Sequence, residues 1–320
     1  MELTYTDTNY KDLGVLNFQK SDFDIGGDNN FEISIPLTSW VSGIDFGSLI
    51  YEEGYETGGV VSAIETATDE QLVKLKGYTW RGYLANHIIE PPSGQDYLTV
   101  SGDVNACISS VINNKYSGLI MGSSQPAGVN ISNYQFKRYV TVLDGLTEML
   151  KTVEYKLKIT HTIDGTVEVS AVPVVDYSEN IELSQDSRIN FKIENNKGTV
   201  NHLICLGAGE LKNRTVLHLY LDSKGNIGTT QYFFGINEIM QTYDNANSEN
   251  LRADGEKEFK NLLNGYSLSM DIQALGIDVD IGDIIGGRDY ITGITVKKPL
   301  KSKIITFENG VKSVQYNLEE

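Results

Sequence analysis

The sequence predicts a mainly β protein with an α+β insertion, in which one chain carries two homologous small antiparallel β-barrel domains. The first observation is a repeat: GSLIYEEGYETGGVV at 47–61 returns as GDIIGGRDYITGITV at 282–296, without a gap and at a constant offset of 235 residues. The second is a period of two in the hydrophobic residues around both copies, which is typical of half-buried strands. The third is a change to helical periodicity between the copies.

The repeat extends towards the N-terminus in the same register. Asp45 falls on Asp280, two positions before the first glycine of each copy, and Val61 falls on Val296. Apolar residues at alternate positions also coincide: Phe31, Ile33, Ile35 and Leu37 fall on Tyr266, Leu268, Met270 and Ile272. We therefore expect equivalent folds at 31–64 and 266–299.

Composition favours an ordered, turn-rich β protein. The chain has 320 residues, enough for about two to three domains. It is 40% hydrophobic and holds 18 Tyr and 31 Gly against 6 Pro, a balance typical of folded chains. The net charge of −17 argues against a surface that neutralises phosphates. Two interpretations of the charge stay open: it repels DNA that passes close by, or it only keeps the protein in solution.

The cysteines and the N-terminus indicate a chain made and folded in a cytoplasm. Cys107 and Cys205 lie in apolar surroundings, and we expect both to be buried thiols. Residues 1–13 combine neither the basic nor the apolar segment of a signal peptide. The longest apolar runs are shorter than a membrane span, so no membrane insertion is expected.

Residues 1–95 are predicted to form the first barrel. Phe31, Ile33 and Ile35 share one face of a strand, and further strands are expected at 47–50, 59–64 and 72–78. The Glu90–Gly94 stretch, EPPSG, breaks this pattern and is a linker candidate.

Residues 96–185 are predicted to form the inserted α+β domain. A helix is expected where Val104, Cys107, Ile108, Val111 and Ile112 form one apolar stripe, with Ser101 or Asp103 at its start. A second helix should begin at Thr141, and Leu143, Leu146 and Leu150 should mark its buried side. A hairpin follows, in which 155–160 and 167–171 flank a two-residue turn at Asp164-Gly165.

Residues 186–320 are predicted to form the second barrel. Strands are expected at 191–193, 200–206 and 216–221, and one helix at 248–264, capped by Ser248 and ended by Asn264-Gly265. A final hairpin should turn at Asn309-Gly310.

The sequence offers little chemistry. His87, His161, His202 and His218 have no metal-type spacing, and no nucleophile elbow, phosphate loop or zincin motif occurs. Asp278, Asp280 and Asp283 could hold Ca²⁺, but a solvated face or a structural turn is the simpler interpretation. Tyr78, Trp80 and Tyr83 could form a sugar-stacking platform, although such residues more often fill cores and interfaces. We therefore predict no catalytic, cofactor-binding or metal-binding residues, no cofactor and no enzymatic activity.

The order of these parts resembles the baseplate hub or tail-tip hub proteins of tailed bacteriophages and prophages. The similarity is carried by four stretches: FEISIP at 31–36 leading to Gly47, GYTWRGYLANHIIEPP at 77–92, NHLICLG at 201–207, and DIGDII at 280–285 with the closing strands. It covers nearly the whole chain. It implies two homologous β-barrels with inserted α+β domains, assembled as a trimer.

The resemblance also implies a function. Such a hub joins the hexameric tail tube, or a distal tail protein, to the trimeric tip, spike or fibre at the tail tip or baseplate of the virion. Its acidic channel lets DNA pass without specific binding during ejection, after the tail has attached to the host cell. Two alternatives remain: a carbohydrate-binding or glycan-degrading phage tail β protein, with a groove lined by Trp80 and paired carboxylates, and a cell-surface adhesin module.

Overall fold

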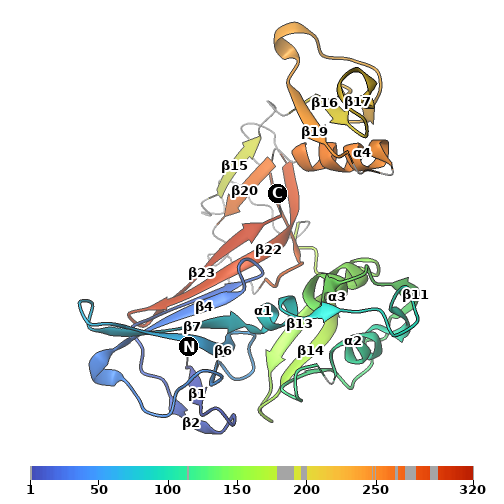
Figure 1. The fold of residues 1–320 in the computed structure, drawn as a ribbon. Helices are drawn as coiled ribbons and strands as arrows, with labels where there is room; N and C mark the ends of the chain where they lie inside the picture. Colours follow the sequence, from blue (N-terminus) through green and yellow to red (C-terminus); the bar gives the residue numbers. More distant parts are fainter. Residues whose placement is uncertain are drawn as a thin grey trace. The chain divides into compact units, whose positions relative to one another are not determined.

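The computed structural model describes residues 2–113, 115–178, 191–195, 200–246, 248, 250–263, 266–270, 279–288 and 295–319. The chain divides into two compact units (Figure 1). The first comprises Met1–Asn190, Met270–Arg288 and Lys297–Glu319, and the second Phe191–Ser269 and Asp289–Val296 with the last residue. The predicted class, mainly β with an α+β insertion, is confirmed. The domain boundaries at 95 and 185, and the closure of each copy into a barrel, stay predictions.

A ten-stranded sheet dominates the first unit, and its neighbours run in the order β2-β1-β5-β6-β7-β4-β3-β22-β21, with β23 paired to β22. Its strands are β1 (Thr4–Thr6), β2 (Asp12–Val15), β3 (Lys20–Ile25), β4 (Asn30–Pro36), β5 (Leu49–Tyr51), β6 (Gly58–Ala67), β7 (Leu72–Thr79), β21 (Ile284–Arg288), β22 (Thr295–Glu308) and β23 (Val311–Leu318).

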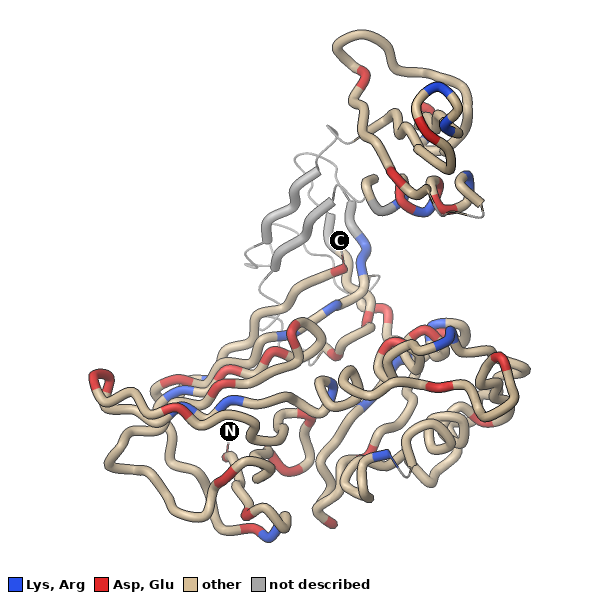
Figure 2. The backbone as a smooth tube through the Cα atoms, in the orientation of Figure 1, with Lys and Arg blue, Asp and Glu red and all other residues tan. Residues whose placement is uncertain are grey.

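The predicted alternation decides which side of this sheet is buried. Phe23, Ile33 and Leu75, from three neighbouring strands, lie on one face and are fully buried. This is expected because successive side chains of a strand point to opposite faces of the sheet. The opposite face carries charged residues from neighbouring strands, and Figure 2 shows them along the sheet. There Lys76 pairs with Glu65 and Glu32 at 2.8 and 3.3 Å.

The two copies of the repeat share this sheet. Strand β22 of the second copy pairs antiparallel with β3 of the first, from Lys303 opposite Ile25 to Glu308 opposite Lys20 (Figure 1). Ile305 consequently enters the same apolar cluster as Phe23. Backbone hydrogen bonds therefore join segments from opposite ends of the chain.

The repeat is confirmed in the local geometry of its turn. Gly47 and Gly282 have φ angles of 93° and 95°, a left-handed conformation that glycine adopts readily. The amide of Ser48 donates to the carbonyl of Asp45 at 3.0 Å, and the amide of Asp283 donates to that of Asp280 at 3.0 Å. The acidic residue before each glycine thus marks the same structural turn, as the sequence predicted.

Beyond the turn, the gap-free alignment is wrong by four residues. The amide of Gly47 donates to Val61 and that of Gly282 donates to Leu300, both at 2.8 Å, so Val61 corresponds to Leu300 and not to Val296. A register shift follows both positions, between Val61 and Ala63 in β6 and between Leu300 and Ser302 in β22. A longer connection in the second copy therefore separates the turn from its partner strand, and 289–294 of that connection lie outside the described residues.

The inserted segment packs two helices against a three-stranded sheet of order β10-β14-β13. Its elements, with the short helix before it, are α1 (Trp80–Ala85), β8 (Ile88–Ile89), β9 (Thr99–Asp103), α2 (Val104–Ile112), β10 (Ile120–Gly122), β11 (Asn130–Gln135), β12 (Val140–Thr141), α3 (Val142–Lys151), β13 (Tyr155–His161) and β14 (Val167–Pro173).

Both predicted helices of the insertion are confirmed. Every residue of the predicted stripe on α2 is buried, and Asp103 is the cap that accepts a hydrogen bond from the Asn105 amide. Thr141 caps α3 by accepting from the Asp144 amide. Of the three predicted buried leucines, Leu146 and Leu150 are buried, whereas Leu143 is only half-buried. The β13–β14 hairpin is confirmed too, but its turn is longer than predicted: the Thr162 amide donates to Thr166 and leaves three residues between them.

The second unit contains a four-stranded sheet of order β18-β17-β16-β19, covered by one helix. Its elements are β15 (Phe191–Asn195), which pairs with β20 (Tyr266–Met270), β16 (His202–Leu206), β17 (Val216–Leu221), β18 (Ile227–Gly228), β19 (Met240–Asp244) and α4 (Leu251–Leu262). Short 3₁₀ helices at Leu37–Ser39, Leu211–Asn213 and Gly235–Asn237 complete the two units.

Helix α4 is shorter than the predicted helix at 248–264. Asn250, and not Ser248, is its cap, because the Asn250 side chain accepts from the Ala253 amide. The Ser248 hydroxyl instead donates to Asp254 at 2.5 Å. The predicted end at Asn264-Gly265 lies outside the described residues. No described helix is long and apolar enough to cross a membrane.

The two cysteines are buried thiols, as predicted. Burial raises the pKa of both. Cys205 lies against α4, where a Cβ added at Gly255 would come within 2.5 Å of its sulfur. Both residues therefore act as small core hydrophobes.

Candidate functional site

The first unit holds a cleft of about 670 Å³ whose lining comes from three parts of the chain. Gly26 and Arg81 come from the segment that contains the first copy of the repeat (1–95), Leu143 and Lys156 from the insertion, and the 281–284 turn and Leu300 from the segment that contains the second copy. Its lining includes both apolar and charged side chains. The cleft therefore exists only where all three parts meet.

Arg81 connects the first copy to the insertion. It lies on α1 and is buried, with its Nε donating to Glu56 at 2.5 Å. Its Nη2 also donates to the carbonyl of Leu157 in β13 at 3.2 Å. A buried guanidinium needs both a counter-charge and partners for its N–H groups, and this arrangement supplies them.

Lys156 connects the insertion to the second copy. Its ammonium, on β13, lies 2.6 Å from a carboxylate oxygen of Asp283, and both side chains are almost inaccessible to solvent. Asp283 also accepts hydrogen bonds from the amides of Val175 and Asp280. The charge on Asp283 is thus compensated by one cation and two oriented N–H groups.

The acidic residues predicted near the second glycine turn therefore contact lysines. Lys303 donates to Asp280 at 3.0 Å. Burial by itself would raise the pKa of Asp280, but the nearby cations Lys303, Lys156 and Arg81 together lower it. Asp278 lies outside the described residues. The contacts with Lys156 and Lys303 explain the positions of Asp280 and Asp283 without a bound cation.

The predicted aromatic group divides between core and surface. Trp80 is fully buried, whereas Tyr78 is 44% exposed and meets Tyr83 edge to face at 6.3 Å. A ring with no accessible face cannot stack on a sugar. Trp80 therefore fills the core, and the predicted carbohydrate groove lacks its main residue.

His161 is a buried neutral imidazole. It is 1% exposed, its ring stacks on Tyr51 at 3.6 Å between centroids, and neither ring nitrogen has a hydrogen-bond partner among the described residues. Burial lowers its pKa from 6.5 to about 4, against a smaller opposing effect of Asp12. Between these values the unfolded chain binds a proton that the folded chain does not, so stability falls as the pH falls.

Replacing His161 by Phe is expected to remove this acid sensitivity. Phe fills a similar volume and has no polar atoms to desolvate. The wild type should lose about 3 kcal/mol of unfolding free energy between about pH 7 and pH 4 from this residue alone, and the variant should not. Urea unfolding at both pH values measures the difference. A variant as acid-sensitive as the wild type would contradict this account.

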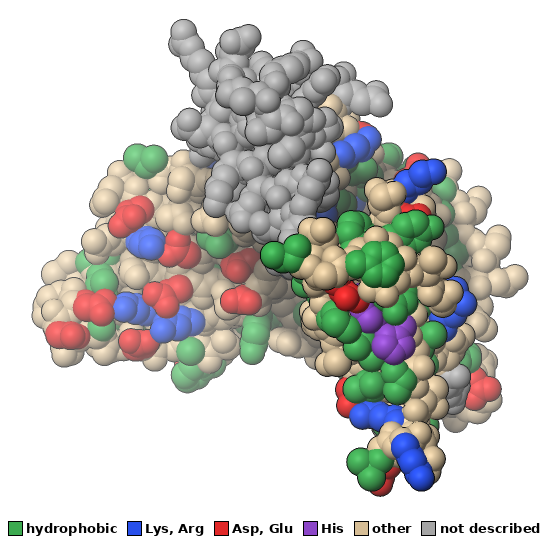
Figure 3. All heavy atoms as spheres, turned by 90° about the horizontal axis from the view of Figure 1, so that it is seen from above, with side chains coloured by type: hydrophobic (Ala, Val, Ile, Leu, Met, Phe, Trp, Pro, Cys, Tyr) green, Lys and Arg blue, Asp and Glu red, His purple; other side chains and the backbone are tan. Residues whose placement is uncertain are grey.

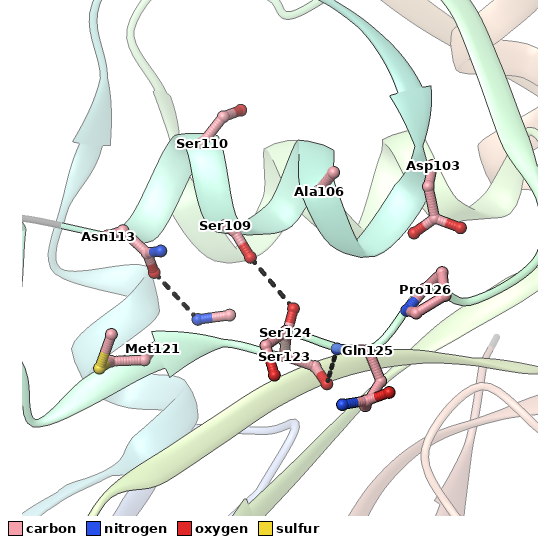
Figure 4. A pocket seen from close by; sticks show the side chains of 11 residues that line it. Asp103, Ala106, Ser109, Ser110, Asn113, Met121, Ser123, Ser124, Gln125 and Pro126 are labelled. Carbon is pink, nitrogen blue, oxygen red and sulfur yellow. Dashed lines mark hydrogen bonds between the residues drawn. The ribbon is translucent and has the colours of Figure 1, made fainter.

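A second groove, of about 700 Å³, lies between α2 and the 121–126 segment (Figure 4). Its polar groups bind one another: the Ser109 hydroxyl donates to the Ser123 carbonyl at 3.3 Å, and Asn113 accepts from the Gly122 amide at 3.1 Å. The Ser123 hydroxyl accepts from the Gln125 amide (Figure 4). These contacts fix the segment on the helix, so the groove is explained as local structure.

The second unit contains a chain of hydrogen bonds that was not predicted from the sequence. Glu238 lies 2.6 Å from Nδ1 of His202, and Nε2 of His202 lies 2.7 Å from Nδ1 of His218. The histidines belong to the predicted strands at 200–206 and 216–221. Nine residues connect β16 to β17, and with a connection of this length the sequence does not predict which residues of the two strands lie side by side. Among the described residues no group of three or more His, Cys, Asp or Glu side chains is arranged to hold a metal ion.

Comparisons with known proteins identify the fold. No protein-family model matches the sequence, and no curated protein matches it. Among solved structures, the prophage MuSo2 43 kDa tail protein from Shewanella oneidensis matches with a TM-score of 0.56 and 12% identity, over 100% of this chain and 98% of that one. The tail protein from Neisseria meningitidis MC58 matches with a TM-score of 0.51 and 16% identity, over 100% and 96%.

The chain therefore shares the fold of these two tail proteins along its whole length. The overall fold of a tail protein is confirmed, whereas the two closed barrels and the trimer that the resemblance implies stay predictions.

Proposed function

We propose that this chain is a structural, non-enzymatic tail protein of a phage or prophage, which acts as a trimeric hub at the tail tip or baseplate. It joins the tail tube, or a distal tail protein, to the tip, spike or fibre, and DNA leaves through its central channel. The observation that carries the proposal is the repeated turn, Asp45–Ser48 and Asp280–Asp283, in a chain with a tail-protein fold.

A duplicated unit has a geometric use in such a machine. Three subunits with two similar units each present six similar positions, so a three-fold ring can stack on a six-fold tube. The sheet that joins β3 to β22 supports this arrangement, because it fixes one copy to the other by backbone hydrogen bonds. The four-residue difference between the copies lies in the connection after the turn, where each copy would meet a different neighbour.

The charged face of the large sheet suits a wall along which DNA moves without binding. Three of its described lysines are paired: Lys20 with Asp22, Lys74 with Glu70, and Lys76 with Glu65 and Glu32. Phosphates bind where ammonium or guanidinium groups are free to release counterions. Lysines that are already paired, in a chain of net charge −17, provide few free cationic groups for phosphates to bind.

Light scattering after size-exclusion chromatography tests the trimer. The chain mass is 35.4 kDa, and the expected species has three times that mass, alone or once the tail tube protein is added. A species of 35.4 kDa under both conditions would contradict the hub. So would cleavage or tight binding of cell-wall polysaccharide by a monomer, which would favour the alternative of a carbohydrate-active tail protein.

A further inference from the structure

We propose that His202 and His218 form a binding site for one divalent transition-metal ion, such as Zn²⁺, on the surface of the second unit. The two imidazoles lie on neighbouring strands, β16 and β17, and face each other through ring nitrogens 2.7 Å apart. The site belongs to the second unit and not to the 670 Å³ cleft of the first unit, and the tail function does not require it.

Glu238 prepares His202 as a ligand. Its carboxylate lies 2.6 Å from Nδ1 and accepts the proton there, which leaves the lone pair on Nε2. Gln231 donates to the same carboxylate oxygen at 2.8 Å and holds it in place. A carboxylate on the far nitrogen is the usual arrangement behind a metal-bound histidine. His202 therefore presents a basic nitrogen of fixed orientation towards His218.

Nδ1 of His218, which faces Nε2 of His202, can bind a metal ion while His218 keeps its proton on its other nitrogen. Because the His202 proton lies on Nδ1, its Nε2 can only accept a hydrogen bond. The proton between Nε2 of His202 and Nδ1 of His218, which lie 2.7 Å apart, therefore belongs to Nδ1 of His218. His218 is exposed, so its proton can move to Nε2, which faces water, and Nδ1 then offers a second lone pair. The metal replaces the shared proton, and His218 remains neutral in its other tautomer.

The surroundings hold the rings and leave space for the ion. His202 is 4% exposed and stacks on Tyr220 at 4.2 Å between ring centroids, so it is a fixed ligand. Two Zn–N bonds of about 2.0–2.1 Å need the nitrogens to be about 0.6 Å further apart than they are, and rotation of exposed His218 supplies this. Figure 3 shows histidine side chains at the surface among hydrophobic ones. Water completes the coordination on the open side.

Two protein ligands make a site of modest affinity, and this agrees with the absence of a third such side chain from the described cluster. Imidazole suits Zn²⁺, Cu²⁺ and Ni²⁺ and discriminates against Ca²⁺ and Mg²⁺, which prefer oxygen ligands. The net charge of −17 raises the local concentration of cations around the chain. The competing interpretation is a proton-sharing pair that binds no metal.

Titration of the full-length chain with ZnCl₂ at about pH 7.5, followed by calorimetry, tests the proposal. The wild type should bind one Zn²⁺ at this site, and His218→Gln should weaken binding at least tenfold. His218 is exposed, so this variant should keep its fold. Glu238→Gln should weaken binding about 10- to 100-fold through loss of the oriented carboxylate. His87→Gln, which changes a histidine of the first unit, is the matched control and should bind as the wild type does.

Nitrogen NMR of the imidazole rings gives a second readout. Zn²⁺ should move the His218 proton from Nδ1 to Nε2 and leave the His202 proton on Nδ1. A wild type that binds no Zn²⁺ would overturn the proposal in favour of the proton-sharing pair. Unchanged affinity in His218→Gln would overturn it in favour of zinc bound elsewhere. Neither outcome bears on the trimer, which is measured by mass.

Discussion

Replacement of Lys156 by Met is expected to lower the unfolding free energy of the first unit by about 3–5 kcal/mol, the usual cost of removing one partner of a buried ion pair. Asp283 is 1% exposed, so its carboxylate stays away from water when the ammonium 2.6 Å away is lost. The methionine side chain fills a similar volume, so the loss reports the uncompensated charge and not a cavity. Urea unfolding monitored by tryptophan fluorescence measures it, because Trp80 belongs to this unit.

Two comparison variants make the result specific. Lys158→Met changes an exposed lysine two positions along the same strand and should shift stability by less than about 0.5 kcal/mol. The double variant Lys156→Met with Asp283→Asn removes the charge as well as its partner and should recover part of the loss. Equal losses in Lys156→Met and Lys158→Met would show that the pair does not hold the insertion to the second copy.

Replacement of Gly77 by Ala is expected to destabilise the same unit by about 3 kcal/mol, at the upper end of overpacking effects. A Cβ at Gly77 would lie 2.0 Å from the Val60 carbonyl and 2.8 Å from the Phe31 ring. The ring is buried in the apolar cluster and the carbonyl belongs to the paired strand β6, so neither can move away freely. The expected readout is a lower urea midpoint with an unchanged m-value.

Gly228→Ala, in the second unit, is the control for a glycine-to-alanine change that meets no neighbouring atom, and its unfolding is followed by far-UV circular dichroism because the tryptophans belong to the first unit. Gly228 lies in β18, with nothing within 4 Å of an added Cβ and no left-handed φ. Alanine should be neutral or slightly stabilising there, because it restricts the unfolded chain. If Gly77→Ala were as stable as Gly228→Ala, the close packing of Phe31 against β6 and β7 would be wrong.

Elements that local sequence determines were predictable. The stripe on α2 spans nine residues, and the cap that starts the helix is the residue immediately before it. The turns at Gly47 and Gly282 share a backbone conformation that glycine adopts readily, so the short pattern Asp-X-Gly identifies both. In these cases the residues that decide the structure lie within a few positions of each other.

Features that depend on distant partners were not predictable. Alternation along β13 places Lys156 with Lys158 on a polar face, yet Lys156 is buried because the turn at Gly282 packs against it, with an added Cβ 3.1 Å away. The contact between His202 and His218 depends on strand register across a long loop, and register is set by tertiary packing. The four-residue shift after the second turn was also not predictable, because a gap-free alignment matches similar residues, whereas the shift is defined by backbone hydrogen bonds between distant residues.

In the proposed hub, one chain supplies two equivalent units to a three-fold ring. Electron cryo-microscopy of the protein bound to its tail tube partner shows whether it does. We expect three chains around a central channel, with the turns at Asp45–Ser48 and Asp280–Asp283 at alternating, equivalent positions around the ring. A particle in which only one of the two turns faces the tube, or in which the chain is present as a single copy, would contradict it.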